Sequence, residues 1–230
     1  MLNRSLCVGV DPPGAWAIWC MDGCLCSGVG DNEMLAGRQL NDAIRQYGLQ
    51  GRRYLMVGVE RPWGVKVAGG EKAIIKNAIA CGYWIRHLES AATLTWSPMA
   101  NQWRRWVGVH GQGDERKKLA VRRTTVLAEM QGEPAKPTTN HNEAEARLIA
   151  MATWMRAGCI VHGDLVHRWM LKFNVPYRQP SLQWNVEMRG RNDKMVVVGH
   201  GGSRRKAWVP RPALKEKRNE DEDQGDEGPF

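Results

Sequence analysis

Two apolar runs in the first sixty residues of the chain each end on a carboxylate. Asp11 follows the run 6–10, and Glu60 follows the run 54–59. Short apolar runs of this kind predict buried strands, so each carboxylate would stand where a strand meets solvent. Charge at such a position costs free energy unless a cation is held there. The pattern therefore predicts a cation site at one edge of a sheet.

A third carboxylate lies near the start of a helical stretch over 141–150. Asn142 and Glu145 are three residues apart on one helix face, and His141 lies four residues before Glu145 on that face. Glu145 is the residue of this helix best placed to face the strand ends. Two strand-end carboxylates and one helix carboxylate form the oxygen-rich set that Mg²⁺ prefers, and such a set suits two-metal hydrolysis of phosphodiesters.

The same helix carries a start signal. Asn140 is the expected N-cap, and Glu143, three residues on, is its expected capping-box partner. This structural role is the favoured interpretation of Glu143, over a role as a metal ligand.

The charge distribution favours a nucleic-acid ligand. The chain of 230 residues has a formal net charge of +9, but its last twelve residues contain six carboxylates and no lysine or arginine. The preceding body therefore carries +15, which is typical of a surface that attracts a polyphosphate. A soluble basic protein without such a ligand is the alternative.

Hydrophobic periodicity predicts strands and helices in alternation through the first 150 residues. Gly48 is the expected stop of the first helix, and a loop containing Gly108, Gly111 and Gly113 is expected before the third. The predicted strands are 6–10, 15–21, 25–29, 54–59 and 92–96, and the predicted helices are 32–47, 71–88, 115–130 and 141–150.

Three segments are expected along the chain. Residues 1–158 form the main domain, residues 159–202 a C-terminal extension, and residues 203–230 a flexible tail that is first basic and then acidic. Within the extension, 181–188 and 194–200 could pair as a β-hairpin. No apolar stretch is long enough to cross a membrane and no signal peptide is recognised, so we expect no membrane partner.

The six cysteines are expected to be reduced thiols in a chain of this size. A zinc site at Cys20, Cys24 and Cys26 is the alternative, but this spacing lacks a partner motif.

The order of the predicted elements resembles that of the RNase H-like fold, and in particular the RuvC type of Holliday-junction resolvase. Four segments carry the likeness: 8–12 (Val-Gly-Val-Asp-Pro), 57–60 (Val-Gly-Val-Glu), 97–118 with its tryptophans, glycines and basic residues, and 141–150 with Ala-Glu-Ala-x-Leu-Ile-Ala. The resemblance implies an α/β fold in which helices flank a mixed five-stranded sheet, with residues 1–158 as the nuclease domain.

The resemblance also implies a catalytic set. Asp11, Glu60 and Glu145 match three acidic metal ligands of the family, and Asn142 matches a fourth position where relatives have Asp or His. An amide offers an oxygen without a charge, so His141 is a candidate auxiliary ligand. Two Mg²⁺ ions per site are implied, and Mn²⁺ is expected to replace them.

Further residues match positions where the family contacts DNA. Trp63 lies in the loop after Glu60, where relatives stack an aromatic ring on unpaired bases; packing of the loop is the alternative. Basic residues lie where the family steers the phosphate backbone, and a solvated basic face is the alternative for each; they are Lys66, Arg104, Arg105, Lys117 and Lys118.

The function implied by the resemblance is that of a structure-selective endonuclease, which resolves four-way (Holliday) or other branched DNA in recombination and repair. The family acts as a homodimer, and the long helix over 71–88, whose apolar stripe Ile75 and Ile79 widen, could pair two protomers. Compact, divergent versions are often viral, so a bacteriophage version is considered. The expected location is the cytoplasm, which would be the host's for a viral protein.

Two other functions stay open. The chain could be a different RNase H-like nuclease that cuts flaps or RNA–DNA hybrids. It could also be a junction-binding or packaging factor with weak or no catalysis, because the neutral Asn142 weakens the ligand set. Incubation with a labelled four-way junction, with and without Mg²⁺, distinguishes these functions.

Overall fold

The computed structural model describes residues 5–62, 71–132, 137–160, 162–175, 194–200 and 203–209. The chain divides into two compact units, Met1–Leu182 and Gln183–Phe230. The first unit is an α/β domain that contains every predicted metal ligand. The second contains, among the described residues, a two-stranded antiparallel ribbon.

A five-stranded mixed sheet forms the centre of the first unit, in the order β3-β2-β1-β4-β5. The first three strands are antiparallel neighbours, whereas β1, β4 and β5 run parallel. The strands are β1 (Cys7–Asp11), β2 (Ala15–Cys20), β3 (Gly23–Val29), β4 (Tyr54–Val59) and β5 (Ala92–Trp96). All five strands therefore lie where the apolar runs predicted them, with differences of one or two residues at their ends.

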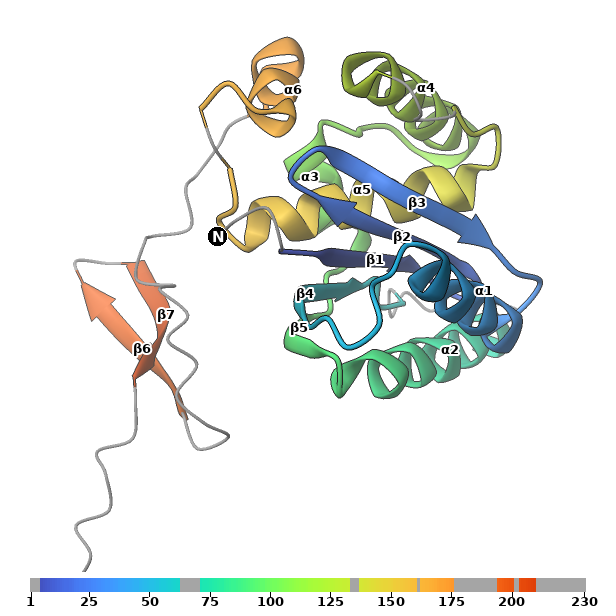
Figure 1. Cartoon of the computed structure of the whole chain (residues 1–230). Coiled ribbons are helices and arrows are strands. Elements are labelled where there is room, and N and C mark those ends of the chain that lie inside the picture. The colour runs from blue at the N-terminus through green and yellow to red at the C-terminus, as the bar shows by residue number, and fades with distance from the viewer. Residues whose placement is uncertain are drawn as a thin grey trace, which may run out of the picture. The chain divides into compact units, whose positions relative to one another are not determined.

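Helices cover both faces of this sheet (Figure 1). One face packs against α1 (Glu33–Gln46) and α2 (Glu71–Glu89). The opposite face packs against α5 (His141–Arg156), and α3 (Ala100–Val107) and α4 (Gly113–Gln131) contact α5 in turn. Two separate hydrophobic cores result, one on each side of the sheet.

The helix α5 packs unusually close to the sheet because two glycines lie beneath it. A Cβ on Gly9 of β1 would overlap the backbone nitrogen of Ala150 and lie 2.5 Å from the carbonyl oxygen of Ala146. A Cβ on Gly58 of β4 would overlap the hydroxyl of Thr153. The missing side chain of Gly9 lets the backbone of α5 rest directly on β1, and the missing side chain of Gly58 leaves room on β4 for the side chain of Thr153.

Helix α5 is almost completely buried after its first turn. Every residue from Leu148 to Met155 is buried, and so are Ala144, Glu145 and Ala146. The helix therefore lacks an exposed face over most of its length, because the sheet lies on one side and α3 and α4 on the other. Glu145 is the only carboxylate among these buried residues.

The boundaries of α1 and α2 agree with the prediction within one residue, and α5 begins where predicted but extends to Arg156, six residues past the predicted end. Asn32 caps α1 by accepting hydrogen bonds from the backbone N–H groups of Met34 and Leu35, and Gly48 follows the helix with φ +64°. Asn140 caps α5 in the same way.

Two described helices were not predicted. α3 lies where a loop was expected after Pro98, and α6 (Leu165–Phe173) lies in the segment after 158, where no pattern was recognised. Both are short, and their signals are the apolar pairs Trp103/Val107 and Leu165/Trp169, each four residues apart. Eight- and nine-residue helices hold few such pairs, which explains why they were missed.

β6 (Lys194–His200) pairs antiparallel with β7 (Ser203–Val209), a pairing that was not predicted. The predicted pairing of 194–200 with 181–188 is not tested, because 181–188 lies outside the described residues. The segment 203–209, expected to be flexible, is a strand. Residues 181–188 and 210–230, including the acidic tail, lie outside the described residues.

In the described part of the chain, no helix has the length and apolar character needed to cross a bilayer.

We predict that Gly9→Ala destabilises the domain by about 3 kcal/mol, a value at the upper end of overpacking effects, since backbone and not a flexible side chain stands in the way of the new methyl group. Gly82→Ala is the matched control: Gly82 lies in the exposed part of α2 with no atom within 4 Å of the place that a Cβ would take, so helix propensity should make this variant slightly more stable. Urea unfolding measures both. A Gly9→Ala protein as stable as the wild type would contradict the close contact.

Candidate metal centre

The carboxylates of Asp11 and Glu60 are neighbours because β1 and β4 run parallel and in register. Val10 pairs with Val59, and the backbone N–H of Glu60 donates a hydrogen bond to the carbonyl of Val10 (3.0 Å). Alternation along the strands places Asp11 on the same face as Gly9, and Glu60 on the same face as Gly58. This is the face covered by α5.

The third carboxylate comes from α5. Glu145 directly precedes Ala146, whose carbonyl oxygen lies over Gly9, so the close helix contact carries Glu145 to the strand ends. Its residue exposure is 5%. Oxygen atoms of Asp11, Glu60 and Glu145 all lie within 4.8 Å of one another. The structure therefore brings together three of the four predicted ligands.

The indole of Trp103 fixes the orientation of Glu60. Its Nε1–H donates a 2.5 Å hydrogen bond to Glu60 Oε2, and the ring itself is fully buried. Trp103 lies on α3. This helix ends at its C-cap Gly108, which has φ +69°. Trp103 thus holds Oε2 of Glu60, while Oε1 is the oxygen that lies nearer to Arg104.

Two arginines pair with the same carboxylates. Arg104 Nη2 lies 3.3 Å from Glu145 Oε2 and 3.9 Å from Glu60 Oε1, so one guanidinium group spans two of the three acids. Arg116 Nε lies 3.7 Å from Glu145 Oε1. Among the described residues, neither arginine forms an ion pair with Asp11.

Burial and repulsion between carboxylates raise the pKa of Asp11 and of Glu60. The pKa of Asp11 is raised well above its usual value, first by burial and then by the charges of Glu60 and Glu145. Burial also raises the pKa of Glu60 to about 7; Glu145 adds to this rise, while Arg104 and the Trp103 hydrogen bond oppose it. Carboxylates that are this costly to ionise favour a bound cation.

The donor set fits a hard divalent cation. All three groups offer oxygen atoms only, they come from rigid elements, and they stand close enough to share one ion. Cysteine and histidine, which would favour zinc, are absent from this cluster. All six cysteines are free, and in the described part of the chain they form no metal-binding group with other residues, so the zinc alternative has no support.

The two other predicted ligands lie at the start of α5. Asn142 is half-buried, and its backbone N–H donates to the Asn140 side chain; its role as a fourth ligand stays a prediction. His141 is not part of the ligand group of His, Cys, Asp and Glu side chains formed by the described residues. It lines a hollow between α4 and the start of α5.

This hollow is strongly basic. Its volume is about 450 Å³, and Asp114 is the one acidic residue among those that line it. Two of its basic lining residues, Lys117 and Lys118, are predicted DNA contacts. The full lining consists of Asp114, Lys117, Lys118, Val121, Arg122, Thr139 and His141. Arg116 pairs with Glu145 of the carboxylate cluster, and the next residue, Lys117, lines the hollow. One helix therefore contributes neighbouring basic residues to both places.

The other predicted DNA contacts differ in their exposure and in whether the structure describes them. Arg105 is exposed on α3, whereas Arg104 turns inward onto the acidic cluster. Trp63 and Lys66 lie outside the described residues, so their roles stay predictions. Trp103 and Arg116 were not predicted as site residues; the segment 97–118 drew attention to both, but only tertiary packing shows that they reach Glu60 and Glu145.

Glu143 has a structural role, although not in the predicted form. Its backbone N–H donates to Asn140, but its carboxylate accepts hydrogen bonds from Ser27 (2.5 Å) and Thr138 (2.6 Å) and pairs with Arg147 (2.8 Å). These partners hold its pKa below the usual value even though burial alone would raise it. Glu143 thus joins the start of α5 to β3 and does not close a capping box.

We predict that the metal-free protein becomes less stable as the pH rises from about 4.5 to about 7. The folded state binds the Glu60 proton more tightly than the unfolded chain does, so ionisation of Glu60 in this window favours unfolding. The loss should be on the order of 3 kcal/mol. Thermal unfolding in a chelating buffer measures it, and Glu60→Gln is the control that removes this titration. Parallel pH profiles for the two proteins would refute the prediction.

Comparison with models of known protein families gives no match to this chain, and comparison with curated protein sequences gives none either.

Proposed function

We propose that this protein is a Mg²⁺-dependent endonuclease that cuts branched DNA, with four-way junctions as its preferred substrate. The observation that carries the proposal is the gathering of Asp11, Glu60 and Glu145 within 4.8 Å at the ends of two parallel strands and on the helix that crosses them. Oxygen ligands in this arrangement suit metal-assisted phosphodiester hydrolysis.

The topology supports an RNase H-like assignment. A sheet of order β3-β2-β1-β4-β5, in which β2 alone runs opposite to the other four strands, is crossed by a buried helix that supplies the third acid. This is the order of elements and acids from which the resemblance to RuvC-type resolvases was drawn. The likeness now rests on strand pairing as well as on sequence order.

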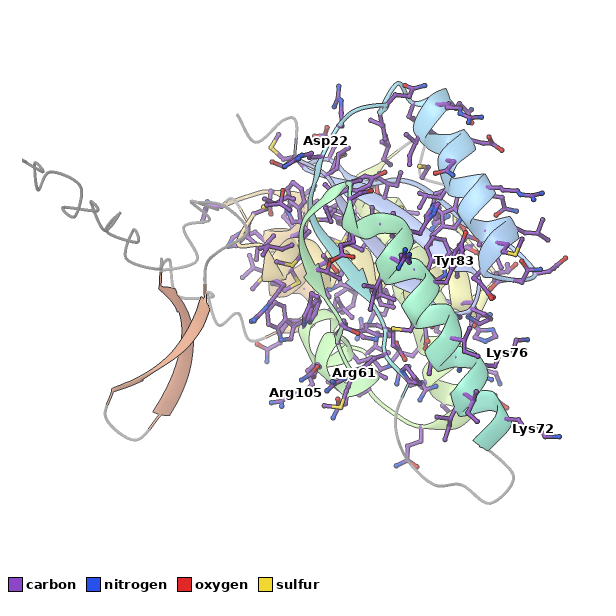
Figure 2. The ribbon with its side chains drawn as sticks, turned by 90° about the horizontal axis from the view of Figure 1, so that it is seen from below. Asp22, Arg61, Lys72, Lys76, Tyr83 and Arg105 are labelled. Carbon is purple, nitrogen blue, oxygen red and sulfur yellow. The ribbon has the colours of Figure 1, made fainter. Side chains whose placement is uncertain are left out.

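Charge supports a nucleic-acid substrate. The basic hollow on α4 lies on the helix that also supplies Arg116 to the cluster, so a bound strand could run from one to the other. Lys117, Lys118 and Arg122 would hold phosphates there without reading sequence. Arg105 adds a further exposed cation on α3 (Figure 2).

Each site residue has a distinct part in the proposed hydrolysis. Asp11, Glu60 and Glu145 would hold Mg²⁺, which supplies a more acidic water and a counter-charge for the phosphoryl oxygens. Trp103 keeps Glu60 in one orientation through the Nε1–H bond to Oε2. Arg104 and Arg116 place positive charge where the scissile phosphate would arrive. The expected products carry 5′-phosphate and 3′-hydroxyl ends.

Helix α2 offers a surface for pairing two copies of the chain. Ile75 and Ile79, one turn apart, are 59% and 63% exposed. Lys72 and Lys76 project from the same half of the helix (Figure 2). Exposed branched apolar side chains on a helix face favour a protein contact, and a two-fold dimer would present two catalytic sites to a symmetric junction.

A second function is favoured by one observation. Arg104 and Arg116 offset two of the three negative charges in the cluster, which weakens its attraction for cations. A junction-binding protein with little or no catalysis would be compatible with such neutralisation. Cleavage of a labelled four-way junction in the presence of Mg²⁺, beside flap, duplex and RNA–DNA hybrid substrates, separates the two functions and tests the substrate preference.

We predict that Asp11→Asn, Glu60→Gln and Glu145→Gln each reduce junction cleavage by more than about 100-fold, because each removes a ligand charge. Junction affinity should be unchanged or higher, since the phosphate contacts remain. Glu129→Gln, a change on the exposed part of α4, is the matched control and should cleave normally. Near-normal turnover by any of the three site variants would remove that residue from the site.

We predict that Ile79→Asp converts the protein from a dimer to a monomer, because a carboxylate would be buried at the paired α2 surface. Light scattering after gel filtration measures the mass. Leu171→Asp is the matched control: Leu171 is 70% exposed on α6 and should tolerate the charge without a change of mass. A wild-type protein that is monomeric at micromolar concentration would exclude this interface.

A further inference from the structure

We infer that Arg104 acts as a built-in cation of the metal centre, so that the site holds one divalent ion beside a fixed guanidinium group in place of two ions. This inference rests on the proposed function, because it concerns the same three carboxylates. It assigns Arg104 a position among the metal ligands, in addition to the contacts with the DNA backbone and the transition state that the resemblance implied.

The first argument is the position of the guanidinium group. Arg104 Nη2 lies 3.4 Å and 3.3 Å from the two oxygens of Glu145, and 3.9 Å from Glu60 Oε1. A second divalent ion shared by these two carboxylates would compete with this contact. In the described structure no ion pair within 4.0 Å joins Asp11 to either arginine, although both charges act on it, so the oxygens of Asp11 are less occupied by the arginines than those of Glu145.

The second argument is charge. Three ionised carboxylates and two guanidinium groups leave one net negative charge in the cluster. One divalent ion and one phosphodiester would bring the total to zero. Two divalent ions with the same phosphodiester would leave two unbalanced positive charges in a buried site, which is costly. Asn142 cannot supply the missing negative charge, because an amide is neutral.

The third argument is that Arg104 is held in place. Its side chain is 13% exposed, and its guanidinium carbon lies 4.9 Å from the centre of the Trp103 ring. The same indole donates to Glu60. Trp103 therefore positions both Glu60 and the cation paired with it, and an arginine supported in this way is pre-organised and not a mobile surface charge.

A guanidinium group can do part of the work of a second ion. It offers planar N–H donors to phosphoryl oxygens and keeps its positive charge at any working pH. It cannot make a bound water more acidic, so that part stays with the single divalent ion. Arg104 is therefore a positioning and charge-balancing residue that prepares the site before DNA arrives.

The test is a count of bound ions in the absence of DNA. Mn²⁺ binding to the full-length protein is followed by electron paramagnetic resonance and by calorimetry, at fixed pH and ionic strength. The wild type is expected to bind one Mn²⁺ per chain. Arg104→Gln is expected to bind a second ion, or to bind the first at least about tenfold more tightly, since a competing charge within 4 Å has gone.

Matched variants assign the effect to the ion pair. Arg105→Gln removes the neighbouring, exposed charge of α3 and should leave both the number of ions and their affinity unchanged. Arg104→Lys keeps a charge and should stay closer to the wild type than Arg104→Gln. If Arg104→Gln fails to fold, two Mn²⁺ ions per wild-type chain would still overturn the inference, and Arg104→Lys takes the place of Arg104→Gln in the comparison.

The outcomes separate this inference from the proposed function. Two Mn²⁺ ions per wild-type chain would overturn the role of Arg104 and leave the nuclease intact. Identical binding by the wild type and a folded Arg104→Gln protein would overturn it as well. A wild type that binds no divalent ion would overturn both proposals together. One ion in the wild type, with tighter or additional binding in Arg104→Gln, supports the inference.

Discussion

The contact between α5 and the two central strands determines most of what this protein can do. A helix normally stands off a sheet by the width of the side chains between them, and here that width is reduced at Gly9 and Gly58. Only this approach brings a side chain from α5 to the carboxyl ends of β1 and β4. Glycine is demanded at these positions by the space available and not by backbone conformation, because neither residue has a positive φ.

The close contact has an electrostatic cost, and the neighbouring helices are arranged to offset it. Three acids forced together in a largely buried place repel one another and are poorly solvated. The groups that offset this cost come from α3 and α4, the helices that pack outside α5. They are the indole N–H of Trp103 and the guanidinium groups of Arg104 and Arg116. The outer helices thus contribute polar groups to the site as well as apolar cover to α5.

Much of the first unit could be predicted from the chain alone. The apolar runs before Asp11 and Glu60 predicted β1 and β4, and their acids meet as expected because parallel neighbours end together. The helical spacing of Glu145 placed it on the right face. These features are local or depend on one strand pairing.

What the sequence did not predict depends on long-range packing. Nothing in the pattern of α3 shows that Trp103 reaches Glu60 while Arg105 faces solvent, since both lie in one short basic and aromatic run. The pairing of 194–200 with 203–209 was missed because the alternation in 194–200 suits more than one partner strand.

The hydrogen bonds of Glu143 have a consequence for the precision of the centre. Glu143 ties the first turn of α5 to Ser27 on an edge strand, and Thr153 meets Gly58 nearly three turns later. A helix held at two such points cannot slide along its axis or roll about it. A slip of one residue would carry Glu145 about 1.5 Å along the axis and turn it by about 100°, away from Asp11. The contact between Ser27 at the edge of the sheet and Glu143 therefore helps to fix the distances between the three acids.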